Sequence, residues 1–261
     1  MKPVTLIDKF NICNAGVVLV VLSAMLPATA QAQENWTFNL TPYIWFAGVD
    51  GESSTIPPLP AAPIEVSPSD AVEDTEVSYM AMFSATKGRH GVLVDFIYAD
   101  VRTDEELVEE LGLNLRATSK STLASLAYVY QFYAESDSQL DVFAGARYWD
   151  VETVLKFSGG QGLLDGRRVD NAEDWIDPLL GLKGRKQLGD SRFYLAGWAS
   201  MGGFGGGSDL FYDLSLSLGY QWSEAIGTTL GYRLLDVDYE KDGFLYDIEQ
   251  SGVTLGLTWR F

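Results

Sequence analysis

One stretch of the sequence, LFYDLSLSLGYQW at residues 210–222, alternates between two kinds of side chain. Leu, Tyr and Trp fill the even-numbered positions, whereas Asp, Ser, Gly and Gln fill the odd-numbered positions from 213 onward. Because successive side chains of a β-strand point to opposite faces, the stretch predicts a strand with one apolar face and one polar face.

The same alternation recurs through the rest of the chain. Near the start of the pattern, Trp36, Phe38 and Ile44 share one parity, and Thr37 and Asn39 share the other. The segment 192–201 has an ambiguous parity. The pattern predicts an all-β protein of about ten strands, at residues 36–46, 77–86, 92–98, 122–132, 140–151, 175–185, 192–201, 210–222, 226–237 and 247–261.

The connections between these strands alternate in length. Tight turns rich in Gly, Ser and Asp are expected at residues 87–90, 134–139, 187–191 and 223–225. Long acidic or Gly/Pro-rich loops are expected at residues 49–75, 100–121, 152–174, 202–209 and 238–246. Short turns at one rim and long loops at the other predict a closed antiparallel up-and-down transmembrane β-barrel, with eight strands as the alternative count.

Charges at the polar parity distinguish the barrel from a soluble β-sandwich, which alternation alone would also fit. A dry sandwich core could not hold unpaired charges, whereas a barrel lumen can. The apolar parity, by contrast, often ends in an aromatic residue, as an interfacial girdle requires. We predict that the inward-facing charged residues are Asp95, Asp141, Arg147, Asp177, Lys183, Arg185, Asp213 and Arg233.

The N-terminus has the three parts of a secretory signal peptide. Lys2 and Lys9 make its start positive, residues 15–26 are mostly apolar, and Ala30-Gln31-Ala32 is a small-x-small cleavage pattern. The apolar run is too short for an uncleaved anchor, because a membrane helix needs about 20 residues. We therefore expect residues 1–32 to be cleaved and residues 33–261 to form a single barrel domain in the cell outer membrane.

Several motifs resemble those of known proteins over essentially the whole chain after the signal peptide. The ending Val253-x-Leu255-x-Leu257-x-Trp259-x-Phe261 is similar to that of Gram-negative outer-membrane β-barrels. This resemblance implies that Trp259 and Phe261 form an assembly signal read by the barrel-assembly machinery. More narrowly, the chain resembles an uncharacterised proteobacterial family of such barrels. The segments that carry this resemblance are Gly145-Ala-Arg147-Tyr-Trp149, Glu173-Asp-Trp175-x-Asp177-Pro178-x-x-Gly181, Gly202-Gly203-Phe204-Gly205 and Gly231-Tyr-Arg233-x-x-Asp236-Val-Asp238-Tyr239.

Charge and residue types exclude several functions. The chain carries 36 Asp and Glu against 18 Lys and Arg, a net charge of −18, which disfavours nucleic-acid binding. Its one histidine, His90, falls in an expected turn rather than beside a nucleophile, and its one cysteine, Cys13, precedes the expected cleavage point. We therefore predict a protein that is not an enzyme and needs no cofactor.

The charged lumen allows two interpretations. The charges could pair and fill the lumen together with long side chains, as in most small barrels. They could instead line a narrow pore for small solutes or ions. We favour the filled lumen, with an envelope or surface interaction role for acidic outer loops.

An acidic motif near the C-terminus overlaps a calcium-loop pattern. Asp238, Glu240, Asp242 and Glu249 have its spacing, but the expected hairpin context favours a plain turn and no metal site. Outer-membrane lipid and lipopolysaccharide are the expected partners. Acidic loop residues could reach lipopolysaccharide phosphates through divalent ions, and those singled out are Asp104, Glu105, Glu106, Glu109 and Glu110.

Overall fold

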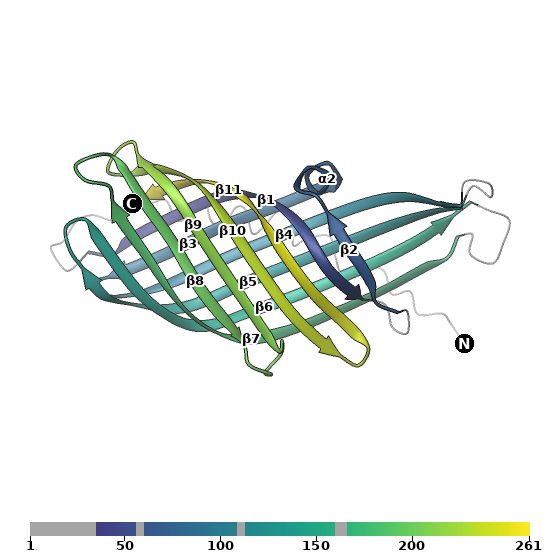
Figure 1. Cartoon of the computed structure of the whole chain (residues 1–261). Coiled ribbons are helices and arrows are strands. Elements are labelled where there is room, and N and C mark those ends of the chain that lie inside the picture. The colour runs from purple at the N-terminus through teal and green to yellow at the C-terminus, as the bar shows by residue number, and fades with distance from the viewer. Residues whose placement is uncertain (1–34, 56–59, 109–112, 160–165) are drawn as a thin grey trace, which may run out of the picture. The chain divides into compact units, whose positions relative to one another are not determined.

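Ten long antiparallel strands wrap into a closed barrel in the computed structural model, which describes residues 35–55, 60–108, 113–159 and 166–261 (Figure 1). The expected signal peptide lies outside the described residues. The strands of the barrel are β1 (Thr37–Ser54), β3 (Thr75–Lys87), β4 (His90–Val108), β5 (Leu113–Ala134), β6 (Ser138–Ser158), β7 (Arg168–Gln187), β8 (Phe193–Gly203), β9 (Leu210–Gln221), β10 (Ile226–Lys241) and β11 (Phe244–Arg260).

Each barrel strand pairs with its neighbours in sequence, and the last strand closes on the first. The β1–β11 ladder runs from Asn39 opposite Arg260 to Ser54 opposite Leu245. At the rim where the chain ends, the backbones of Phe38 and Phe261 exchange two hydrogen bonds of 3.0 Å. The prediction of a closed up-and-down barrel of ten strands is confirmed, and the alternative of eight is wrong.

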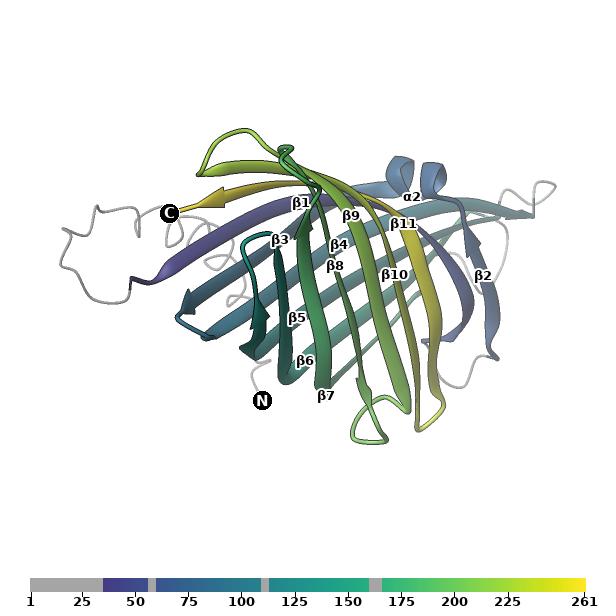
Figure 2. The same ribbon diagram turned by 60° about the vertical axis from the view of Figure 1, so that its left-hand side comes forward.

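The strands extend much further than the sequence pattern indicated. The β4–β5 ladder continues to Val108 opposite Leu113, and the β6–β7 ladder continues to Lys156 opposite Arg168. β10 and β11 likewise pair as far as Lys241 opposite Phe244. The prediction of loops at residues 100–121, 152–174 and 238–246 is therefore wrong. The sequence of these extensions has polar residues at both parities, so the apolar alternation disappears. The backbone pairing nevertheless continues (Figure 2).

The predicted first loop contains two small elements. Strand β2 (Ala62–Val66) pairs with the outer end of β1, and helix α2 (Pro68–Asp74) follows it. The hydroxyl of Ser67 accepts a hydrogen bond from the amide of Asp70 at 3.3 Å, and Pro68 begins the helix. No helix among the described residues is long and apolar enough to cross a membrane.

The outward face of the barrel is an apolar band. Leu216, Leu230 and Ile176 are each about 60% exposed, at 64%, 59% and 62%, as expected for side chains that face lipid. Strand β8 has a definite parity, because Phe193 and Leu195 point outward and Tyr194 is buried inside. Aromatic rings gather on this face at the short-turn rim, in the contacts Phe38–Phe261, Phe38–Phe83, Phe193–Tyr220 and Tyr220–Trp222.

The core of the protein lies inside the barrel, toward the rim of the long strands. Trp175 stacks on Tyr239 with ring centroids 3.9 Å apart and on Trp149 at 5.6 Å. The edge of Phe211, which is fully buried, meets Trp149. Leu235, Val237 and Ile248 complete this packing with at most 2% exposure each, so the outer half of the lumen is filled by apolar side chains.

Candidate functional site

A buried network of ion pairs crosses the middle of the lumen, and Arg233 on β10 is its centre. Its Nε and Nη2 donate to the two oxygens of Asp213 at 3.0 and 2.7 Å. Nη2 also donates to Asp95 at 2.8 Å, and Nη1 donates to the hydroxyl of Tyr43 at 2.8 Å. The Tyr43 hydroxyl in turn donates to Asp95 at 2.8 Å. The guanidinium therefore joins strands β1, β4, β9 and β10.

A second guanidinium extends the network to β5 and β6. Arg147 donates from Nη2 to Asp213 at 2.7 Å and from Nε to the hydroxyl of Ser125 at 2.9 Å. The indole of Trp198 donates to the other Asp213 oxygen at 3.0 Å. Two arginines thus neutralise two aspartates, and we call the residues Tyr43, Asp95, Arg147, Asp213 and Arg233 the lumen network.

Burial makes the pairing in the lumen network obligatory. Arg233 and Asp213 are each 1% exposed and Arg147 is 3% exposed. An ionised group taken out of water costs several kcal/mol unless a partner compensates it. Aromatic faces add to the compensation, since the Arg233 guanidinium lies 5.1 Å from the ring centroids of both Trp45 and Trp198. Ion pairing and aromatic packing together hold these charged side chains in place at this level of the barrel.

The other four predicted charges lie elsewhere inside the barrel. Asp177 accepts hydrogen bonds from the amide and hydroxyl of Ser208, both at 2.7 Å, and so anchors the β8–β9 loop. Lys183 pairs with the buried Asp141 at 3.2 Å. Arg185 faces the lumen near the short-turn rim. Sequence reasoning missed Tyr43 and Trp198 as partners of the network, although the inward parity of Tyr43 could have indicated it.

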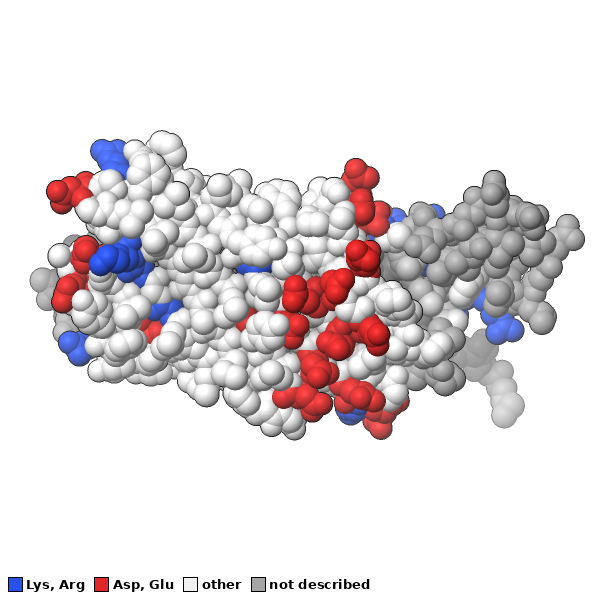
Figure 3. Space-filling model, viewed as in Figure 1, with Lys and Arg blue, Asp and Glu red and all other residues white. Residues whose placement is uncertain are grey.

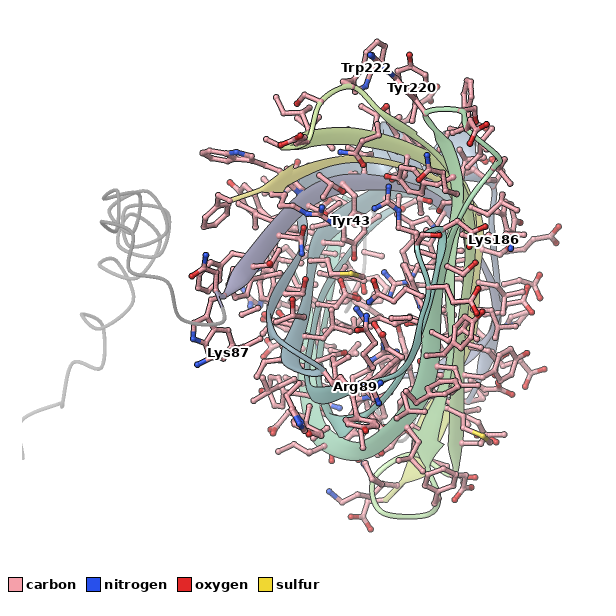
Figure 4. All side chains as sticks on the ribbon, turned by 90° about the vertical axis from the view of Figure 1, so that its left-hand side faces the viewer. Tyr43, Lys87, Arg89, Lys186, Tyr220 and Trp222 are labelled. Atoms are coloured by element: carbon pink, nitrogen blue, oxygen red, sulfur yellow. The ribbon has the colours of Figure 1, made fainter. Side chains whose placement is uncertain are left out.

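A water-accessible cavity of about 490 Å³ occupies the lumen on the other side of the lumen network. Turn residues Gly88, Arg89 and Ala225 line it, so it opens at the short-turn rim. Figure 4 looks into this end, with Tyr43 inside the ring of strands and Tyr220 and Trp222 outside it. Along β10 the inward positions pass from Thr229 in the cavity to Arg233 in the network and Leu235 in the apolar core.

The segment that matches the calcium-loop pattern forms a β-hairpin between β10 and β11. Asp242 and Gly243 make a two-residue turn with φ of 53° and 86°, and Asp238 pairs across the hairpin with Asp247. The strand pairing holds the motif's carboxylates along an extended ladder instead of wrapping them around an ion. In the described part of the chain, no group of three or more His, Cys, Asp or Glu residues could hold a metal ion. The side chains of Asp104, Glu105, Glu106, Glu109 and Glu110 lie outside the described residues.

Acidic side chains instead gather on the outward wall, next to the apolar band. Two rows cross strands β1, β11 and β10, and in each row three carboxylates lie opposite one another. Figure 3 shows them as a red zone beside the white wall of the barrel. Like charges in direct register destabilise a sheet. We call this surface the acidic patch, and it consists of Asp50, Glu249 and Asp236 in one row and Glu52, Asp247 and Asp238 in the other.

Comparison with solved structures identifies the fold. The outer membrane protease OmpT from Escherichia coli matches with a TM-score of 0.61 and 10% identity, over 89% of this chain and 99% of its own. The translocator domain of autotransporter NalP from Neisseria meningitidis covers 94% of both chains at 12% identity, with a TM-score of 0.45. Ail, the attachment invasion locus protein of Yersinia pestis, covers 88% of this chain and 100% of its own at 11% identity, with a TM-score of 0.37.

No protein-family model and no curated protein sequence matches the chain. The identities are too low to transfer an activity, and the match to OmpT shows the fold alone. Together with the apolar outer wall, it defines the class: the chain has the fold of the Gram-negative outer-membrane β-barrel proteins.

Proposed function

We propose that the protein is a non-enzymatic integral outer-membrane barrel that does not conduct ions and acts through its surfaces. The lumen network carries this proposal. Arg233 and Asp213 are almost inaccessible to solvent, and their hydrogen bonds connect opposite sides of the barrel. Beyond them, the apolar core packs inside the outer half of the lumen. An ion crossing this barrel would have to break a compensated buried ion pair.

The placement of histidine supports the absence of catalysis. His90 lies exposed at the short-turn rim, where its ring contacts Tyr128 and Tyr130 on the barrel wall. Its ring is hydrogen-bonded to the phenol of Tyr128, which is not the serine, threonine or cysteine that a hydrolytic relay pairs with histidine. The carboxylates of the lumen network, Asp95 and Asp213, are engaged by arginines and are not among the residues that line the cavity.

Conductance in planar bilayers tests the sealed lumen. We expect the wild-type barrel to insert without steady channel openings. Arg147→Ala, which removes one buried cation, is expected to permit at most brief openings, whereas Lys186→Ala at the exposed short-turn rim leaves the bilayer silent. Steady wild-type openings whose size changes on neutralising Arg147 or Lys183 would instead establish the narrow pore.

Contact with lipopolysaccharide is the second part of the proposal. Because the acidic patch faces outward next to the apolar band, we expect it to lie at the level of the lipid phosphates. Divalent cations shared between these carboxylates and the phosphates would relieve the repulsion within each row.

Thermal unfolding in lipopolysaccharide bilayers tests this contact. Mg²⁺ is expected to raise Tm relative to EDTA, and the double variant Asp238→Asn/Asp247→Asn is expected to lose most of that increase. Glu224→Gln, at the opposite rim, is the matched control and keeps it. An equal response of all three proteins to Mg²⁺ would exclude the acidic patch as the contact surface.

A further inference from the structure

The cavity at the short-turn rim has a charge opposite to that of the protein. The whole chain has a net charge of −18, yet Arg89, Lys183, Arg185 and Arg260 line this cavity. Asp141 is the only carboxylate in the lining, and Lys183 neutralises it at 3.2 Å. The cavity is therefore a basic pocket inside an acidic protein.

Arg185 and Arg260 each lack an acidic partner among the described residues. The Arg185 guanidinium lies 3.8 Å from the centroid of the Tyr194 ring, and its Nη2 donates to the Gln221 side chain at 2.9 Å. Arg260 donates to the amide oxygen of Asn39 at 3.4 Å. Tyr194 and the neutral amides orient both guanidiniums, and most of their N–H groups stay available.

The two guanidiniums share one enclosure, because Arg185 on β7 and Arg260 on β11 both line the cavity. Adjacent like charges in a half-enclosed space are costly, and a bound anion with two charges would relieve the cost. A guanidinium presents its donors in a planar fork that matches a phosphate group better than a point charge does.

The remaining lining indicates what the anion is attached to. Hydroxyls and amides cover much of the wall, and they come from Thr41, Ser84, Gln131, Gln139, Ser217 and Thr258. Gly184, Gly197 and Gly256 leave space between them. A wall of this kind offers hydrogen bonds to a polyhydroxylated body and little to an acyl chain.

We propose that this pocket binds a small, hydroxylated phosphomonoester from the short-turn side of the barrel, with the phosphate held between Arg185 and Arg260. A phosphomonoester carries nearly two negative charges at pH 7 and so matches two guanidiniums. A lipid headgroup phosphodiester carries only one. The site goes beyond the proposed function, because a barrel sealed at the lumen network still exposes this pocket to small molecules at one end.

Calorimetry on the full barrel in a non-ionic detergent without phosphate groups tests the proposal. Glucose 6-phosphate is the probe, and glucose and glycerophosphoglycerol, a phosphodiester, are the comparisons. We expect saturable binding of glucose 6-phosphate, binding of the diester at least tenfold weaker, and no heat with glucose. Raising the ionic strength should weaken the binding, because the recognition is electrostatic.

Three matched variants locate the site. Arg185→Gln and Arg260→Gln should each weaken binding of glucose 6-phosphate at least tenfold. Arg192→Gln removes the same charge from the exposed β7–β8 turn, outside the cavity, and should leave the affinity unchanged. Heat-modified gel migration confirms that each variant is folded. No saturable binding by the folded wild type, equal binding of the diester, or an affinity loss as large in Arg192→Gln would overturn the proposal.

Discussion

Replacement of Arg233 by Met is the perturbation that the lumen network predicts in most detail. Met has a long, unbranched side chain and no charge. The substitution removes two hydrogen bonds to Asp213, one to Asp95 and one to Tyr43. Asp213 keeps Arg147 and Trp198, but Asp95 loses its only cation within the network.

The magnitude follows from the uncompensated charge. Removing one partner of a buried ion pair costs about 3–5 kcal/mol, because the other charge stays buried. We expect Arg233→Met to lower the free energy of unfolding by this amount. Adding Asp95→Asn removes the stranded charge, so the double variant should recover about 1–3 kcal/mol.

Urea unfolding in lipid vesicles, followed by tryptophan fluorescence, measures both effects. Trp45 and Trp198 lie over the Arg233 guanidinium and report directly on this region. Arg192→Met at the exposed rim is the control and should change stability by less than about 0.5 kcal/mol. A loss below about 1 kcal/mol in Arg233→Met, or no recovery on adding Asp95→Asn, would refute the reasoning.

Three further substitutions test other parts of the barrel by the same unfolding assay. Lys183→Met strands the buried Asp141 and should cost about 1–3 kcal/mol, partly offset by Gln139; no loss would mean that Asp141 is uncharged. Gly219→Val should cost about 1–3 kcal/mol, because an added Cβ would lie 2.1 Å from the Tyr194 ring, and a neutral result would place that ring elsewhere. Asp238→Asn should stabilise the barrel in detergent by up to about 0.5 kcal/mol by relieving repulsion within the acidic patch, and destabilisation would contradict the described register.

The sequence was sufficient to predict the membrane-embedded part of the fold. Side chains there meet lipid on one face and the lumen on the other, so residues 210–222 and their counterparts alternate strictly. The outer extensions of β4 to β7 have polar residues at both parities of the sequence, and backbone pairing alone leaves no periodic signal. Helix α2 was missed because its seven residues follow a proline-rich segment and bury none of their side chains.

The candidate site was predictable only as a set of inward positions. Parity assigned all eight charged residues to the lumen, but parity cannot give the depth at which each lies or its partner across the barrel. Arg233 and Asp95, 138 residues apart, meet only because the strand register brings them to one level. The basic pocket was missed because Arg260 lies within the terminal motif, where the apolar parity of Trp259 and Phe261 dominated the interpretation.

The accessibility of single positions along β10 to thiol reagents tests the central claim. According to this claim, the outer face of β10 meets lipid, and its inner face meets water on the short-turn side of the lumen network and a dry core on the side of the long strands. Leu230 faces the lipid, Thr229 lines the water-accessible cavity, and Leu235 lies in the core with 1% exposure. Single cysteines at these positions, in barrels reconstituted in vesicles, are treated with a charged thiol reagent from the short-turn side and with a lipid-soluble one. We predict that the charged reagent labels only position 229, the lipid-soluble reagent labels position 230, and position 235 resists both. Labelling of position 235 by the charged reagent as fast as position 229 would show a continuous water path and contradict the sealed barrel.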